Sequence, residues 1–130
     1  MLRLALVSLF SLFLFSCETG DYPENLPPLE VEKTFPPNDA VVDTDLERIY
    51  VKFSSPVDKA YAYGLVVVSG ANYIHGRSFL EEDGYVIAFY PFEDLPEGKR
   101  IVVRVNKKTK GVDTAPLGEE YRFRFYTENR

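Results

Sequence analysis

Two side chains are unique in this sequence and could do specific chemistry: the only cysteine, Cys17, and the only histidine, His75. A single cysteine can form neither an intramolecular disulfide nor a cysteine-built zinc site, so its thiol remains a nucleophile for covalent attachment. His75 has no serine or cysteine nucleophile pattern around it. Glu81 and Glu82 point in opposite directions in an extended chain, so they do not form the carboxylate pair of a glycosidase. We therefore expect no catalytic residues, no enzyme activity and no cofactor.

The residues that position Cys17 form a targeting signal. A basic start, Met1-Leu2-Arg3, precedes an apolar run over residues 4–15 that only Ser8 and Ser11 interrupt. A helix needs ~20 apolar residues to cross a bilayer, so this shorter run is typical of a secretory signal peptide. Leu14-Phe15-Ser16-Cys17 resembles the lipobox of bacterial lipoproteins, with an aliphatic residue three positions before the cysteine and a small residue directly before it.

The lipobox resemblance implies a membrane anchor. In that family a diacylglycerol is attached to the cysteine sulfur and the chain is cut before the cysteine, which here would remove residues 1–16. A single acyl chain binds a membrane only marginally, whereas two chains anchor stably. Glu18 differs from the Asp that retains such proteins in the inner membrane of enteric bacteria, so the resemblance favours the outer membrane, on its periplasmic or surface face. The alternatives are an ordinary signal peptide with an incidental cysteine, and an uncleaved anchor.

Residues 17–28 read as a tether between the lipid and a folded domain. Glu18 to Pro28 is polar and contains three prolines and a glycine, without a usable periodicity. These features predict an extended linker with a reach of at most about 36 Å. The domain then occupies residues 29–130, a length that fits one folded unit.

The domain has the pattern of an all-β protein. Alternating apolar and polar residues predict about seven strands, at residues 29–35, 47–54, 65–68, 73–80, 85–90, 99–106 and 121–125. Residues 39–46 read as an acidic connection, 65–68 as a strand covered on both faces, and Gly76 as a bulge within one strand. Short strands separated by turns favour an antiparallel two-sheet sandwich, with Phe53, Phe89, Phe123 and Phe125 in its core.

Several landmarks in order along this domain are similar to the bacterial Ig-like domain of surface-layer and cell-envelope proteins. The resemblance covers roughly Val31 to Glu128 and implies an Ig-like β-sandwich. One loop departs from the pattern, because Thr114-Ala115 stands where the family usually has Gly-Asn. The matching segments are Pro36-Pro37-Asn38-Asp39-Ala40, Phe53-Ser54-Ser55-Pro56-Val57-Asp58, Tyr90-Pro91, Leu95-Pro96-Glu97-Gly98, Asp113, and Phe123-Arg124-Phe125-Tyr126-Thr127.

Two groups of side chains are candidates for a partner surface. Tyr61 and Tyr63 fall in a loop and could stack on a sugar or a protein, although tyrosines are also ordinary sandwich residues. The basic group could face anionic lipid or polysaccharide, although a charged hairpin also keeps a strand edge soluble. It consists of Lys99, Arg100, Lys107, Lys108 and Lys110.

A third group is acidic. Asp39, Asp43, Asp45 and Glu47 could bind calcium through oxygen ligands, but they lack the glycine and the ligand spacing of a calcium-hand loop. A solvated connection at one end of the sandwich is the favoured interpretation, so no metal is expected.

The sequence therefore favours a lipid-anchored, non-catalytic module of the bacterial envelope with a binding or assembly role. Its expected contacts are the membrane, through the lipid, and an envelope protein or cell-wall polymer. The formal net charge of −5 argues against nucleic acid, because phosphate backbones need clustered Lys and Arg. The alternatives are a structural subunit of an envelope complex and a carbohydrate- or cell-wall-binding accessory domain.

Overall fold

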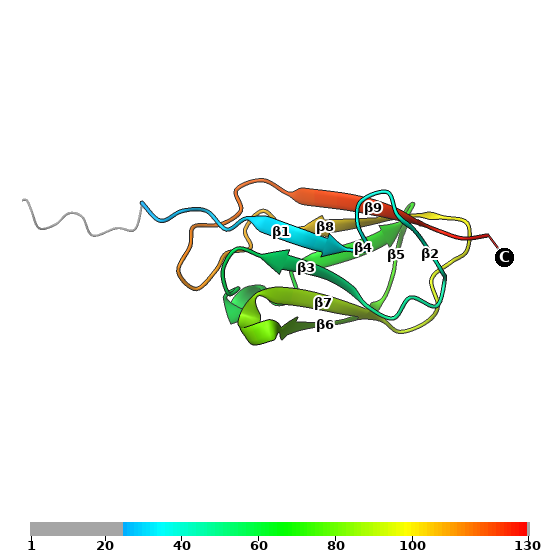
Figure 1. Ribbon diagram of the computed structural model, residues 1–130, viewed down its shortest axis with the longest axis horizontal. Helices are drawn as coiled ribbons and strands as arrows, with labels where there is room; N and C mark the ends of the chain where they lie inside the picture. Colours follow the sequence, from blue (N-terminus) through cyan, green and yellow to red (C-terminus); the bar gives the residue numbers. More distant parts are fainter. Residues whose placement is uncertain (1–24, 130) are drawn as a thin grey trace, which may run out of the picture.

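A computed structural model of the chain describes residues 25–129, which fold into two packed β-sheets (Figure 1). The four-stranded sheet has the order β1 (Val31–Phe35), β3 (Ile49–Phe53), β7 (Val86–Pro91), β6 (Gly76–Glu81). The five-stranded sheet has the order β2 (Val41–Val42), β9 (Tyr121–Thr127), β8 (Arg100–Val105), β4 (Leu65–Ser69), β5 (Asn72–Tyr73). Only β2 and β9 pair in parallel; the other strand pairs are antiparallel. The predicted all-β sandwich is confirmed, with two additional strands of two residues each.

The core lies between the sheets and is built from alternate residues of each strand. Ile49, Val51 and Phe53 of β3 are completely buried, whereas Tyr50 and Lys52 between them are half-buried on the outer face. The strands β8 and β9 follow the same rule. The four phenylalanines expected in the core, Phe53, Phe89, Phe123 and Phe125, are all buried. Because side chains alternate between faces of a strand, the period-two pattern was sufficient to identify this core.

Residues 73–80 differ from the single bulged strand that the sequence predicted. They are divided between β5 in one sheet and β6 in the other, with Ile74 and His75 crossing between the sheets. A Cβ atom at Gly76 would lie 2.5 Å from the carbonyl oxygen of Tyr90 and 2.5 Å from the ring of Phe89. Gly76 is therefore needed for close approach to β7 after the crossing, and it does not mark a bulge.

Two other segments also differ from expectation. Residues 39–46 contain the short strand β2, which extends the five-stranded sheet by pairing with β9. The run at 65–68 is covered on one face only, because Leu65 and Val67 are buried while Val66 and Val68 are half-buried on the outside. In β7, by contrast, Val86 and Ala88 are fully buried although they point away from the core, since Ala88 lies in register between Tyr50 and Phe79.

The chain enters the sandwich at one end and reaches its C-terminal residues at the other (Figure 1). The amide of Leu29 donates to the carbonyl of Ala115 (2.9 Å), and the amide of Ala115 donates to the carbonyl of Pro27 (2.9 Å). Leu29 is buried. At the end of the expected tether, Pro27 is thus hydrogen-bonded to the domain, and Pro28 forms a parallel β-bridge with Ala115. No helix formed by residues 25–129 is long and apolar enough to cross a membrane.

Candidate binding surfaces

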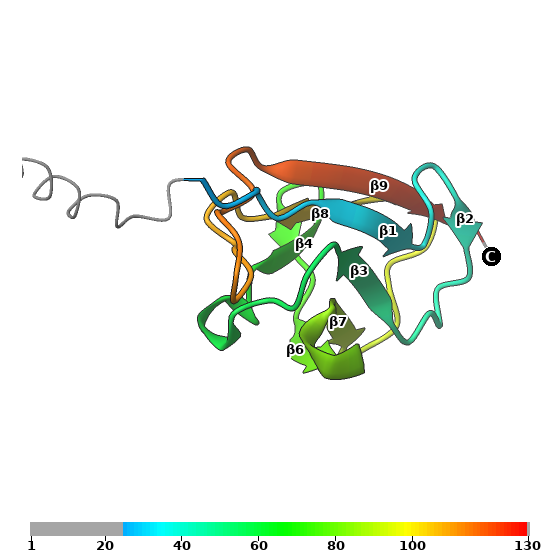
Figure 2. The same cartoon turned by 60° about the vertical axis from the view of Figure 1, so that its left-hand side comes forward.

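Two loops and the entering chain form one end of the sandwich, here called the N-terminal pole: residues 25–29, 54–64 and 106–118. The amide of Asp58 donates to the carbonyl of Lys110 (3.0 Å), and the amide of Asn106 donates to the carbonyl of Gly64 (3.0 Å). Val57 and Gly111 form a β-bridge. Figure 2 shows these loops beside the segment that follows residue 25. Segments far apart in the sequence are therefore held together where the chain joins the domain.

All five residues of the predicted partner surface lie on the N-terminal pole, but they differ in exposure. Tyr63 is 76% exposed, and Lys107 and Lys108 are exposed. Tyr61 instead packs against the core from the short 3-10 turn η1 (Lys59–Tyr61), and Lys110 forms an ion pair with Asp58 (Nζ–Oδ2 3.6 Å). Tyr61 is half-buried, and Tyr63 is the more exposed of the two rings. Lys99 and Arg100, grouped with these lysines by sequence, lie at the opposite end of β8.

An apolar hollow of about 500 Å³ opens beside the pole. Pro56, Val57, Leu80 and Val112 form its apolar wall, and Asp58, Lys59 and Asp83 add charge. Asp83 belongs to the 3-10 turn η2 (Glu82–Gly84) and has a positive φ of 59°. Val112 is exposed. The pole thus combines an aromatic ring, cations and an apolar depression.

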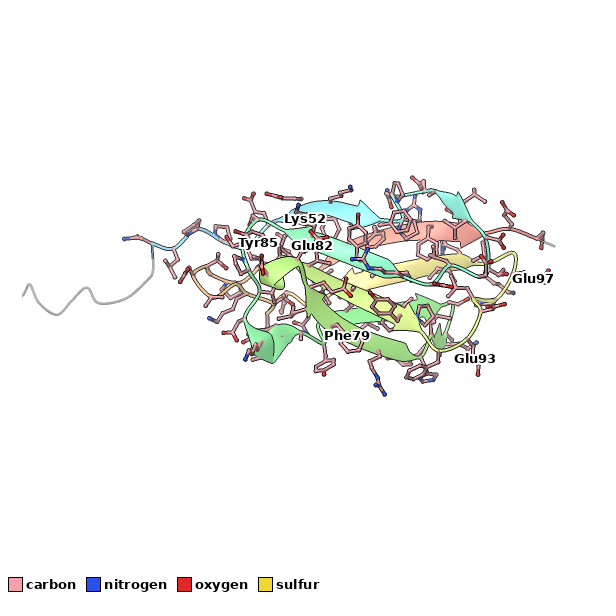
Figure 3. All side chains as sticks on the ribbon, turned by 60° about the horizontal axis from the view of Figure 1, so that its bottom comes forward. Lys52, Phe79, Glu82, Tyr85, Glu93 and Glu97 are labelled. Atoms are coloured by element: carbon pink, nitrogen blue, oxygen red, sulfur yellow. The ribbon has the colours of Figure 1, made fainter. Side chains whose placement is uncertain are left out.

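The outer face of the four-stranded sheet carries a different arrangement, in which the polar groups are paired with one another. Figure 3 looks toward this sheet, with Lys52 on β3 and Phe79 on β6 labelled. Arg48 donates to Glu81 (Nη2–Oε1 2.6 Å), and the Tyr90 hydroxyl donates to the other oxygen of the same carboxylate. The Arg48 guanidinium also lies 4.4 Å from the ring centre of Tyr50. This Arg48–Glu81–Tyr90 network links the residue that precedes β3 with β6 and β7.

The network changes the titration of its members. The hydrogen bond from Tyr90, followed by the one from Arg48, holds the pKa of the Glu81 carboxyl below its ordinary value, against the opposing effect of burial. The same hydrogen bond to the carboxylate raises the pKa of Tyr90. Tyr50 stacks on Phe35, with ring centres 5.6 Å apart. Tyr50 and Tyr90 therefore have partners within the sheet.

The acidic residues do not form a metal site in the described part of the chain. Asp39 forms an ion pair with Arg124 (Oδ1–Nε 2.9 Å), and a carboxylate oxygen of Asp43 accepts the amide of Thr44 (2.8 Å). Across residues 25–129, no group of three or more His, Cys, Asp or Glu side chains is arranged to hold an ion. The calcium interpretation of Asp39, Asp43 and Asp45 receives no support from this geometry.

The expected lipidation residue and its expected lipobox lie outside the part of the chain that the structure describes. Cys17, Leu14, Phe15 and Ser16 lie outside the described residues, as do the whole expected signal peptide and most of the tether.

The surface that sequence reasoning missed is the outer face of β8 and β9, here called the arginine face. It carries Arg100, Arg104, Arg122 and Arg124, and Arg104 lies directly opposite Arg122 in the antiparallel register. The alternation within each strand indicates that these arginines point outward. It does not indicate which strands are neighbours or in which register they pair.

Comparison with known proteins establishes the fold and little more. No protein-family model matches the sequence, and no curated protein matches it. Among solved structures, PcoC, a methionine-rich copper resistance protein from Escherichia coli, is similar over 78% of this chain and 99% of its own, with a TM-score of 0.65 and 18% identity. This chain has one methionine, Met1, so it does not share the composition for which PcoC is described.

Two larger proteins contain a similar domain. The surface layer protein SbsC, domains 1–6, matches 79% of this chain with a TM-score of 0.57 and 18% identity, and the match covers 14% of that protein. L,D-transpeptidase 1 of Mycobacterium tuberculosis matches 78% with a TM-score of 0.52 and 20% identity, over 40% of its chain. The resemblance to surface-layer domains is thus confirmed at the level of fold. The chain has the architecture of the Ig-like β-sandwich domains found in such proteins.

Proposed function

We propose that this chain is a lipid-anchored module of the bacterial cell envelope, with the outer membrane favoured, that binds or assembles with an envelope partner without catalysing a reaction. The observation that carries the proposal is the position of the N-terminal pole. The chain joins the domain at the same pole that presents Tyr63, Lys107 and Lys108.

The distance from a lipid on Cys17 to the domain supports a membrane-facing pole. Pro27 is already hydrogen-bonded to the domain. The nine intervening residues, 18–26, reach at most about 30 Å when fully extended. An anchor of that length keeps the pole, rather than the opposite end, next to the head groups. Each exposed lysine near an anionic membrane surface contributes ~1 kcal/mol of attraction.

The anchor is tested by Cys17→Ala in the full chain expressed in a Gram-negative host. The protein should move from the detergent-extracted membrane fraction to the soluble fraction or remain unprocessed, and its intact mass should lack the lipid increment. The matched control, Lys108→Ala, keeps the lipid and should remain in the membrane. If Cys17→Ala leaves both mass and fractionation unchanged, the anchor does not exist.

The partner role is tested by photocrosslinking in cells. A photoreactive amino acid at Tyr63 or Lys108 should give a discrete adduct with one envelope component, while the same group at Phe79, on the outer face of the four-stranded sheet, should not. An adduct with one protein at fixed stoichiometry favours a structural subunit. An adduct with cell-wall glycan, weakened by Tyr63→Ala, favours the carbohydrate-binding alternative. Crosslinking from Phe79 alone would place the contact elsewhere and contradict the proposed pole.

A further inference from the structure

We propose that the arginine face binds an anionic glycan, a sugar polymer that carries carboxylate or phosphate groups. This site lies on the outer face of the five-stranded sheet, separate from the N-terminal pole. It does not depend on lipidation of Cys17, so each proposal can fail without the other.

The charge on this face is opposite to that of the whole chain. The formal net charge is −5, yet four of the eight arginines lie on two adjacent strands: Arg100, Arg104, Arg122 and Arg124. None of the seven lysines belongs to these two strands. Arginine differs from lysine because its planar guanidinium can hold a carboxylate or phosphate through two parallel hydrogen bonds. The residue type therefore fits anion recognition better than it fits general solubility.

Only two of these four arginines form ion pairs. Arg122 pairs with Glu120 (2.6 Å) and Arg124 with Asp39 (2.9 Å), and both ion pairs are exposed to solvent. Arg104, by contrast, forms no ion pair and no side-chain hydrogen bond within residues 25–129, and its Nε is buried without an acceptor; it interacts with the charge of Glu120 only at longer range.

One of these two arginines without an ion pair also faces a like charge. Arg104 lies directly opposite Arg122, and like charges in that position destabilise a sheet. Arg100, like Arg104, has no ion pair or side-chain hydrogen bond in the described structure. A bound anion would relieve the repulsion and use the free donors.

The shape of the face fits a ligand with several groups. Two shallow hollows of about 360 and 250 Å³ lie next to each other and share Val102 and Arg122 as lining residues. Tyr73 lines the first together with Arg104, and Arg100 lines the second. Arg100 and Arg104 are four residues apart on one strand, which separates them by about 13 Å. One small anion cannot span that distance, so the ligand must carry more than one anionic group.

An aromatic ring at the edge favours a glycan over an acidic protein. Tyr73 is 62% exposed and can stack against a sugar ring while the arginines hold the charged substituents. The centre of the face is charged, and the aliphatic side chains around the arginines are only half-buried: Val102 on β8, and Val66 and Val68 on the neighbouring strand β4.

The test measures binding of the full chain in detergent at one fixed low salt concentration, because such binding weakens steeply with salt. The probes are polygalacturonate for carboxylates, phosphomannan for phosphates, neutral mannan, and polyglutamate as an acidic peptide. We expect tighter binding to one or both anionic glycans than to mannan or polyglutamate. The two anionic arms identify which group the site prefers.

Variants then assign the binding to the face. Arg104→Gln with Arg122→Gln should weaken binding at least tenfold, and the corresponding double Lys variant, which keeps charge but loses the guanidinium geometry, several-fold. Tyr73→Ala should weaken glycan binding while leaving weak polyglutamate binding unchanged. The matched control is Arg77→Gln, an exposed arginine on the other sheet.

Four results would overturn the proposal: no binding to either anionic glycan, equal or tighter binding to polyglutamate, an unchanged affinity for the double Gln variant, or an equal loss for Arg77→Gln. The double Lys variant keeps the test decisive if the double Gln variant fails to fold. Membrane attachment of all these variants should be unchanged, which separates this result from the anchor.

Discussion

The two outer faces of the sandwich cover the same core but differ in how their charged side chains are paired. On the four-stranded sheet, Arg48, Glu81 and Tyr90 satisfy one another across three strands. On the five-stranded sheet, Arg104 and Arg122 lie opposite each other with like charge. A satisfied polar network contributes to stability, whereas an unsatisfied one lowers it and remains available to a ligand. One face therefore pairs its polar groups within the protein, and the other presents guanidinium groups without ion pairs to solvent.

The largest expected effect tests whether the two faces belong to one cooperative unit. Phe125 is completely buried in the core that both sheets share. Phe125→Ala removes that packing and should lower the free energy of unfolding by about 3–5 kcal/mol. Chemical denaturation should remain a single transition whether it is followed by far-ultraviolet circular dichroism or by tyrosine fluorescence.

The control for the core prediction is Phe92→Ala, which changes an exposed phenylalanine and should have little effect. Two separate transitions in the Phe125→Ala variant would show that the sheets unfold independently, and the comparison of two faces on one core would then be invalid.

The second effect concerns the satisfied face. Tyr90→Phe removes the hydrogen bond to Glu81 and should cost about 1 kcal/mol, because the carboxylate is partly exposed and water replaces part of the bond. The folded-state pKa of Glu81 is lower than its unfolded value. The contribution is therefore complete above the unfolded pKa of about 4.3 and is lost as the pH falls through the lower folded pKa.

Denaturation of wild type and Tyr90→Phe at several pH values measures this dependence. The difference in unfolding free energy should be constant near neutral pH and should shrink below about pH 4. Tyr63→Phe, which changes an exposed hydroxyl on the pole, is the control. A difference that grew on acidification would mean that the hydrogen bond does not favour the ionised carboxylate.

The smallest effect has the opposite sign and concerns the unsatisfied face. Arg104→Thr removes one of two like charges opposed across β8 and β9 and should stabilise the protein by about 0.5 kcal/mol. The gain should decline as salt screens the repulsion. Arg77→Thr, on the other sheet, should give no comparable gain. A loss of stability in Arg104→Thr at low salt would show that the charge of Arg104 is paired within the protein. The two faces would then be alike in this respect.

The sequence predicts the core residues of a single strand better than it predicts how the strands are connected and arranged. Ile49, Val51 and Phe53 were recognised as one buried face because their alternation lies within a single strand. The crossing at Ile74 and His75 was missed, because Gly76 reads equally as a bulge or as a close contact until its neighbours Phe89 and Tyr90 are known. The strand β2 was missed because two residues are too few to show a period.

For the candidate surfaces, too, the sequence identified residues but not their arrangement in space. Tyr63 and Lys108 were identified from their residue types, but only hydrogen bonds between the loops at residues 54–64 and 106–118 place them on one pole. Tyr61 was grouped with Tyr63, yet it is half-buried against the core, and its position in a loop does not determine this orientation. The arginines were visible in the sequence as outward positions of two strands. Their opposition depends on the register of β8 with β9.

By itself, the sequence determined the strand pattern, the all-β class and the aromatic core, and it predicts the lipid site at Cys17. These features depend on residues that are close together in the chain, where period-two alternation and short motifs act. The tertiary structure alone decided which strand neighbours which, that residues 73–80 divide between two sheets, and that four arginines meet on one face. Those features depend on hydrogen bonding between distant segments, whose register is selected by the packing of the whole core and by no local pattern.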